Sequence, residues 1–265
     1  MEENNLENKQ HNTNSQKPIV GAIIIAGALI AGAILLRGTA PQPINPTNDP
    51  NDRSATMNVK KVSADEHVLG NIDAPVVIVE YSDTECPFCK SFHNTMHEVI
   101  SQNDNKVSWV FRHYPIPSLH PKAFYEAEAT ECAWEQGGNN AFWQYIDEVF
   151  KRTESNNKLE VSELPKIAQA IGLDVAKFNS CLDSGKYKDK IQASIDEKNK
   201  SGQIGTPFNV IMTKKDITTK MRSDIESAIG SPGAVSFSSN NKKVMSMNGA
   251  LPTDMVNKIL GILLK

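Results

Sequence analysis

Two of the four cysteines, Cys86 and Cys89, lie three positions apart with Pro87 and Phe88 between them. They follow the apolar, β-branched run 76–81 and open a stretch rich in helix formers. The N-terminus of a helix offers unpaired N–H groups and a partial positive charge, and both stabilise a thiolate relative to a thiol. We therefore expect Cys86 to have a lowered pKa and to exchange disulfides, with Cys89, one turn further in, resolving the mixed disulfide.

A carboxylate lies six residues before the first of these cysteines, at Glu80, within the run expected to form a buried strand. Burying a charged carboxylate is costly unless it has a use. We expect Glu80 to relay a proton to or from Cys89. The alternative is that Glu80 ends the strand and reaches solvent.

A zinc site is the competing interpretation of the cysteine pair. Cys86, Cys89, His93 and His97 have helical spacing, and both residue types bind zinc. A tetrahedral site needs ligands that converge from more than one element, however, and the sequence has no second Cys-x-x-Cys. We therefore assign no metal site, and expect His93 and His97 to be polar positions on a partly exposed helix.

The other two cysteines, Cys132 and Cys181, are 49 positions apart, each in a helical stretch. Four cysteines allow three pairings. We favour Cys86 with Cys89 and a structural disulfide between Cys132 and Cys181. Such a disulfide requires an oxidising compartment. The alternative is two buried free thiols.

Composition excludes several classes of protein. The 28 Lys and Arg against 31 Asp and Glu give a net charge of −3, so there is no basic excess for nucleic-acid binding. A hydrophobic fraction of 39% excludes a multi-span membrane protein, and four cysteines in 265 residues exclude a small disulfide scaffold.

The N-terminal part of the chain predicts a membrane tether. Residues 1–18 are polar and expected to be disordered, and residues 19–36 are exclusively Ile, Val, Leu, Ala or Gly. Eighteen apolar residues in a helix approach the thickness of a bilayer. A cleaved signal peptide is the alternative, but an acidic leading segment and a long apolar run favour an anchor. Residues 37–58, rich in Pro and Asn, form a linker to a folded part at 59–265.

The folded part begins with a strand at 76–81, a helix from 87 to about 100 and a strand at 107–112. This β-α-β order implies a right-handed crossover and a parallel strand pair. A strand at 208–212, a β/α segment of undefined layout and a helix at 251–264 close the chain. The helices expected between the second and third strands cover 121–136, 141–152, 164–171, 175–182 and 187–200.

Together these features closely resemble the DsbA-like thiol:disulfide oxidoreductases of the thioredoxin superfamily. The resemblance covers about 65–265, and the combination of motifs is far more specific than the Cys-x-x-Cys alone. The matching segments are 67–70, 74–83, 85–89, 112–115, 120–121, 131–133, 178, 181–182, 184–187, 205–207 and 248–252.

The resemblance implies an α/β thioredoxin fold with a helical domain inserted at about 116–201. It also implies a cis peptide bond at Thr206-Pro207. The residues implied to contact the substrate are Pro87, Phe88, Thr206 and Pro207. No cofactor is implied. The implied partners are the thiols of exported proteins and a membrane protein that re-oxidises or reduces the active site. The implied location is the cell membrane, with the catalytic domain outside the cytoplasm and residues 19–36 in the lipid bilayer.

Several positions depart from the family pattern. Thr84 replaces a frequent aromatic residue, and we expect this to be a local change at the surface. Phe88 cannot stabilise the Cys86 thiolate by charge or hydrogen bonding as a histidine could. Thr206 also occurs in isomerase and reductase relatives, and residues 213–243 are longer than a simple hairpin. We expect an oxidase of exported proteins. The alternatives are a disulfide isomerase or reductase of the same fold, or a tethered metal-binding module.

Overall fold

The computed structural model describes residue 57 and residues 59–265. The predicted tail at 1–18, the predicted anchor at 19–36 and almost all of the linker at 37–58 lie outside the described residues. In the part of the chain that is described, no helix has the length and apolar character needed to cross a bilayer.

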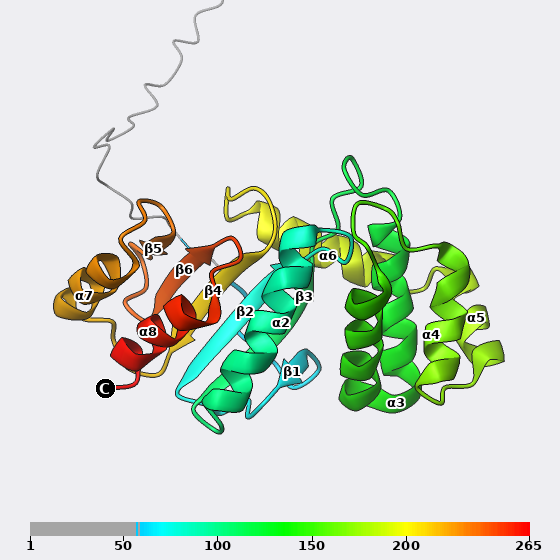
Figure 1. Cartoon of the computed structure of the whole chain (residues 1–265), viewed down its shortest axis with the longest axis horizontal. Helices are drawn as coiled ribbons and strands as arrows, with labels where there is room; N and C mark the ends of the chain where they lie inside the picture. The colour runs from blue at the N-terminus through cyan, green and yellow to red at the C-terminus, as the bar shows by residue number, and fades with distance from the viewer. Residues whose placement is uncertain (1–56, 58) are drawn as a thin grey trace, which may run out of the picture. The chain divides into compact units, whose positions relative to one another are not determined.

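A six-stranded mixed sheet forms the centre of the described domain, in the order β1-β3-β2-β4-β6-β5 (Figure 1). The β-branched run supplies the central strand β2, which pairs parallel with β3 and antiparallel with β4. All other pairs are antiparallel. The strands are β1 (His67–Leu69), β2 (Val76–Ser82), β3 (Val107–His113), β4 (Phe208–Thr213), β5 (Val235–Phe237) and β6 (Val244–Asn248).

Helices cover the sheet and form a separate lobe beside it (Figure 1). α2 and α8 lie side by side on one face, α6 packs against β3, and α3, α4 and α5 pack together as the lobe. The α-helices are α2 (Pro87–Gln102), α3 (Ala123–Arg152), α4 (Leu164–Ala170), α5 (Val175–Ser184), α6 (Lys188–Asn199), α7 (Thr219–Ile229) and α8 (Thr253–Leu263), with a short 3-10 turn at Val161–Glu163. The expected α/β fold is confirmed, and four helices lie between β3 and β4.

Two differences from the sequence prediction have physical reasons. The helices predicted at 121–136 and 141–152 are two arms of α3, joined by a kink at Gly137 and Gly138. Gly138 has φ 63° and ψ −152°, a conformation that residues with a Cβ avoid. The undefined segment 213–243 contains α7, which packs on α8, and β5, which ends the sheet.

Candidate redox site at the start of α2

Cys86 occupies the N-cap position of α2, and Pro87 is the first residue of the helix. Proline suits that position because its missing N–H would have no helical partner there. Cys89 is fully enclosed, whereas Cys86 keeps 5% of its surface exposed. Both are free thiols in this structure. The two sulfurs therefore differ in access, and Cys86 is the one that a second molecule can approach.

The two thiols have opposite pKa shifts. A hydrogen bond from the Cys89 thiol, with further help from the backbone N–H groups of Cys89 and Phe88, lowers the pKa of Cys86 to about 6. Burial raises the pKa of Cys89 well above its ordinary value, and the negative charges of Cys86 and Glu80 add to that effect. At neutral pH the pair therefore holds one thiolate, on Cys86, and one proton, on Cys89.

We expect the thiolate absorbance of the reduced protein to titrate with a midpoint near pH 6. Replacing Cys89 with Ala raises this midpoint, since the largest stabilising contact of the thiolate is lost. The pKa of Cys86 is about 6 in the folded protein and about 9 in the unfolded chain, so between these values the unfolded chain holds one more proton. The unfolding free energy of the reduced protein, compared with that of the oxidised protein, therefore increases as pH rises from about 6 to 9. A midpoint that stays the same in the Cys89→Ala protein would contradict this account.

The loop before β4 lies against Cys86. The peptide bond between Thr206 and Pro207 is cis, and Cys86 Sγ is 3.5 Å from the carbonyl oxygen of Thr206. The buried Lys198 of α6 donates a hydrogen bond to the carbonyl oxygen of Gln203, and this contact fixes the start of the loop to α6. The structure thus brings Cys86, Thr206 and Pro207 together from segments 120 residues apart.

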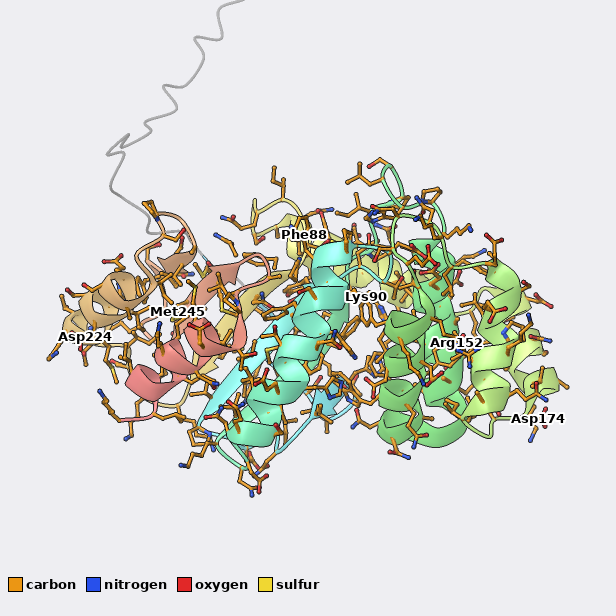
Figure 2. All side chains as sticks on the ribbon, viewed as in Figure 1. Phe88, Lys90, Arg152, Asp174, Asp224 and Met245 are labelled. Atoms are coloured by element: carbon orange, nitrogen blue, oxygen red, sulfur yellow. A yellow bond between two sulfur atoms is a disulfide. The ribbon has the colours of Figure 1, made fainter. Side chains whose placement is uncertain are left out.

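Exposed apolar side chains lie on three segments that are joined to the cysteine loop. Phe88 is 64% exposed at the N-terminal end of α2 (Figure 2), and Ile204, two residues before Thr206, is 93% exposed. Leu119, 64% exposed, lies in a turn that Asp83 fixes next to the cysteine loop. Large apolar side chains exposed in one region are typical of a binding surface.

Glu80 is completely buried in β2, so it does not reach solvent at the end of the strand. Its Oε2 atom accepts a 2.9 Å hydrogen bond from Trp109 Nε1, and burial raises its pKa to about 8. At neutral pH Glu80 is therefore mostly protonated. When it is ionised, its negative charge raises the pKa of Cys89. These properties suit a group that exchanges a proton with Cys89.

Replacing Glu80 with Gln should change how stability depends on pH. Between the unfolded pKa of 4.5 and the folded value of about 8, the folded protein holds one proton more than the unfolded chain, so its stability falls as pH rises. Glu80→Gln removes this slope, because glutamine does not titrate. In denaturant unfolding from pH 5 to pH 8, the unfolding free energy of the variant relative to that of the parent should increase at each step. Parallel pH profiles would rule out a buried, titrating Glu80.

Two carboxylates in the turn before Cys86 fix that turn to the helical lobe. Asp83 Oδ2 accepts hydrogen bonds from the backbone N–H of Ile116 and from His120 Nδ1, at 2.8 and 2.9 Å. Glu85 accepts from the backbone N–H groups of Asn157 and Leu159, at 2.6 and 3.2 Å. The backbone N–H of Asp83 also lies 3.5 Å from Cys89 Sγ.

A third carboxyl group, Glu126 of α3, completes this network. Thr84 Oγ1 donates a 2.6 Å hydrogen bond to its Oε2 atom. Burial first, and then the neighbouring Glu85 and Asp83, raises the pKa of Glu126 to about 9, so it is protonated at neutral pH. Thr84 thus has a buried partner and is not the surface position expected from the sequence.

Cys132 of α3 and Cys181 of α5 form a disulfide, with their Cα atoms 5.8 Å apart. Cys132 is buried in a cluster with Tyr145, Phe178 and Leu182, and Cys181 packs against its edge. This cluster is the core of the helical lobe. The second cysteine pair therefore lies away from the redox pair and joins two helices of the lobe.

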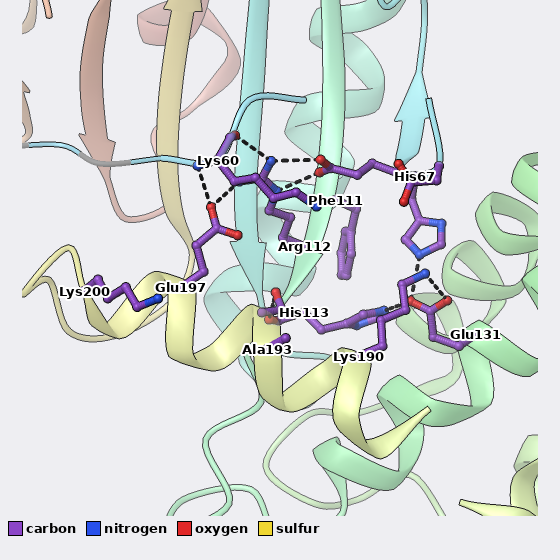
Figure 3. Close-up of a pocket in the computed structure, with 13 residues that line it drawn as sticks. Lys60, His67, Phe111, Arg112, His113, Glu131, Lys190, Ala193, Glu197 and Lys200 are labelled. Atoms are coloured by element: carbon purple, nitrogen blue, oxygen red, sulfur yellow. Dashed lines mark hydrogen bonds and ion pairs between the residues drawn. The ribbon is translucent and has the colours of Figure 1, made fainter. Parts of the chain in front are cut away.

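A cavity of about 550 Å³ lies between β3 and α6. Arg112 bridges Glu66 and Glu197 on one side of it, and Glu131 pairs with His67, His113 and Lys190 on the other (Figure 3). Neither redox cysteine lines it. The cavity is therefore separate from the two free cysteines.

Within residues 57 and 59–265, two clusters of side chains could hold a metal ion. One is His67, His113 and Glu131 at the cavity, and the other is His93, His97 and Asp147 between α2 and α3. The zinc set considered from the sequence is not among them. α2 is partly exposed, as expected, and His97 has a partly exposed side chain on it, but His93 is buried at 3% exposure and packs against Trp109 and Phe150.

Comparison with known proteins begins with a family model described as thioredoxin, which matches residues 62–230. DsbA2 of Pseudomonas aeruginosa has a similar structure, with a TM-score of 0.56 and 24% identity over 77% of this chain and 97% of that one. Oxidised BdbD of Bacillus subtilis has a TM-score of 0.59 and 19% identity over 80% of this chain and all of that one. At these identities the likeness shows the fold alone.

The curated relatives are much longer proteins. The Na(+)/H(+) antiporter NhaA 1 of Mycolicibacterium vanbaalenii is 39% identical over 114 residues, which are 43% of this chain and 18% of the antiporter. The Na(+)/H(+) antiporter NhaA 3 of Salinispora tropica is 34% identical over 142 residues, 54% of this chain and 21% of that protein. The chain thus matches about a fifth of the length of these relatives.

Proposed function

The chain belongs to the thioredoxin family, and from that premise we propose that it is a membrane-tethered thiol:disulfide oxidoreductase that oxidises the cysteines of exported proteins. The observation that carries this proposal is the arrangement of the two sulfurs: Cys86 lies at the N-cap of α2, 3.5 Å from the Thr206 carbonyl oxygen, and Cys89 is enclosed, so that their pKa values shift in opposite directions. Opposite shifts are what a sulfur pair needs to exchange disulfides at neutral pH.

In the oxidising direction, a substrate thiolate attacks Cys86 Sγ of the Cys86–Cys89 disulfide. The bond between the two cysteines breaks, Cys89 leaves and takes up a proton, and a mixed disulfide joins the substrate to Cys86. The second substrate thiolate then attacks the substrate sulfur, and Cys86 leaves as the stabilised thiolate. Two electrons pass from the substrate dithiol to the cysteine pair.

We assign Glu80 to the proton step. Because Glu80 is mostly protonated at neutral pH, it can supply the proton that Cys89 takes up as it leaves. In the reverse direction it accepts that proton. Asp83 and Glu85 act as positioning residues, since they hold the turn that carries Cys86.

The substrate would lie across Cys86 as an extended segment. The backbone at Thr206 and Pro207 would align it, and the exposed rim of Phe88, Ile204 and Leu119 would contact its apolar side chains. We propose a membrane redox partner that re-oxidises Cys86 and Cys89 after each cycle. No cofactor is needed for these steps.

We propose that the catalytic domain lies outside the cytoplasm and is tethered to the lipid bilayer by residues 19–36. The apolar sequence of that segment supports the tether, and the Cys132–Cys181 disulfide supports an oxidising compartment. No ion transport is proposed, because the match to the antiporters covers only about a fifth of their length.

A disulfide isomerase or reductase is the second candidate. It is favoured by Phe88, which cannot stabilise the Cys86 thiolate by charge or hydrogen bonding, and by Thr206, which the resemblance also associates with isomerases and reductases. Such a protein would be kept reduced in the cell by an electron donor instead of being re-oxidised.

Trapping the thiols in living cells with an alkylating mass tag separates the two candidates. For an oxidase, we expect most Cys86 and Cys89 to be protected from the tag until the sample is reduced. A reduction potential well below about −250 mV, near the thioredoxin end of the scale, would overturn the oxidase assignment. Cell fractionation of the chain with and without residues 19–36 tests the tether, which predicts membrane recovery only with that segment.

A further inference from the structure

Three metal-ligating side chains outside the redox pair converge from two helices. His93 and His97 lie one turn apart on α2, and Asp147 lies on the second arm of α3. His93 Nε2 and His97 Nε2 are 2.7 and 2.8 Å from Asp147 Oδ1 and 3.2 Å from each other. We propose that these residues bind one zinc-class divalent cation, which braces α2 against α3.

Hydrogen bonds alone do not account for this triangle. The carboxylate oxygen can only accept, and each neutral imidazole Nε2 either carries a hydrogen or keeps a lone pair. If both nitrogens donate to Asp147, neither can accept from the other. If one accepts from the other, it cannot also donate to Asp147. At most two of the three short contacts are hydrogen bonds at once, whereas a cation attracts all three lone pairs.

The spacing of the donor atoms suits such an ion. For sides of 2.7, 2.8 and 3.2 Å, the point in the plane equidistant from all three atoms is about 1.7 Å from each, shorter than a Zn–N bond of about 2.0–2.1 Å. An ion about 1 Å out of that plane reaches all three atoms at normal bond lengths. The three donor atoms are therefore close enough together to bind one ion.

The surroundings prepare the ligands and leave a way in. The His93 ring is held by packing against Trp109 and Phe150. The side chains of His97 and Asp147 are 39% and 44% exposed. An ion can therefore enter from solvent, and water can complete its coordination.

The other His and Glu cluster lies at the cavity, but its carboxylate is already paired within the protein. Both oxygens of Glu131 have partners, because Oε1 pairs with His67 and His113, and Oε2 pairs with Lys190 at 2.7 Å. His67, His113 and Glu131 are all buried. A lysine ammonium already supplies positive charge there, so that cluster is a satisfied ion-pair network.

A bound ion would join two parts of the fold. α2 carries Cys86 at its N-terminus and packs in the core under the sheet, whereas α3 begins the helical lobe. His93 lies one turn beyond Cys89 on the same helix. An ion that binds the folded protein and not the unfolded chain stabilises the folded state by mass action.

Zinc titration of the full-length protein in detergent tests the proposal. The parent should carry Cys86→Ser and Cys89→Ser, so that no free thiolate can hold the metal and the result does not depend on the redox function. We expect one equivalent of Zn²⁺ to bind by calorimetry and the thermal midpoint to rise with added zinc. His97→Gln and Asp147→Asn should each weaken binding more than tenfold.

Neighbouring residues provide matched controls. Glu98→Gln and Glu148→Gln change the next residue along each helix, which faces other partners, and should leave zinc affinity within about twofold. Co²⁺ in the parent should show visible d–d bands without a sulfur-to-metal charge-transfer band. Equal zinc affinity in the parent, His97→Gln and Asp147→Asn proteins, or no binding by the parent, overturns the proposal.

Discussion

Replacing Cys86 with serine abolishes thiol–disulfide exchange, with a loss of at least about 10³-fold in the rate of oxidation of a dithiol substrate. The reason is that Cys86 is the accessible sulfur and has the lowered pKa, whereas Cys89 is enclosed and keeps its proton. A serine hydroxyl can neither form the mixed disulfide nor leave as a stabilised anion. Refolding of a reduced, disulfide-containing substrate by the purified protein measures the effect.

The Cys89→Ala protein gives the matched comparison. It retains the Cys86 nucleophile but cannot form the intramolecular disulfide, so it should lose catalytic oxidation and accumulate mixed disulfides with substrates or with glutathione. Non-reducing electrophoresis and mass spectrometry detect these adducts. If mixed disulfides form on Cys89 in the Cys86→Ser protein as readily as on Cys86 in the Cys89→Ala protein, the assigned roles are wrong.

The parts of the site that could be predicted from sequence are those encoded locally. A β-branched strand, a cysteine at a helix start and a proline at the first helical position specify the environment of Cys86 within a dozen residues. Glu80 could be singled out for the same reason, because its place in a buried strand makes its burial predictable. Its pairing with Trp109 could not, since that contact depends on the register of β2 and β3.

The positioning residues escaped prediction because their partners are distant in sequence. Asp83 and Glu85 belong to matching segments of the family pattern, yet their roles appear only when the turns at 116–120 and 153–159 fold back onto them. The same holds for His93 and His97. Their helical spacing was visible, but the third side chain, Asp147, comes from a helix 50 residues further on.

Loss of the second disulfide should have the largest effect on stability. We expect the Cys132→Ala/Cys181→Ala protein to lose about 4 kcal/mol of unfolding free energy, within a usual range of about 2–5 kcal/mol, because the bond closes a loop with a sequence separation of 49. Alanine avoids burying a hydroxyl among Tyr145, Phe178 and Leu182. The thermal midpoint should fall by roughly 8–16 °C, at about 2–4 °C per kcal/mol for a domain of this size.

Two comparisons separate this effect from the redox chemistry. The Cys86→Ser/Cys89→Ser protein lacks only the cysteine pair of α2. Under oxidising conditions it should keep the Cys132–Cys181 disulfide and have a much higher thermal midpoint than the double alanine variant. The double alanine variant, assayed well below its own midpoint, should still exchange disulfides through Cys86, because the lobe disulfide does not touch that sulfur.

A loss of under about 1 kcal/mol would mean that packing alone orders α3 against α5 and that the bond contributes little to the lobe. A loss of exchange at a temperature where the variant is folded would mean instead that the disulfide itself is needed to hold the loops that Asp83 and Glu85 bind.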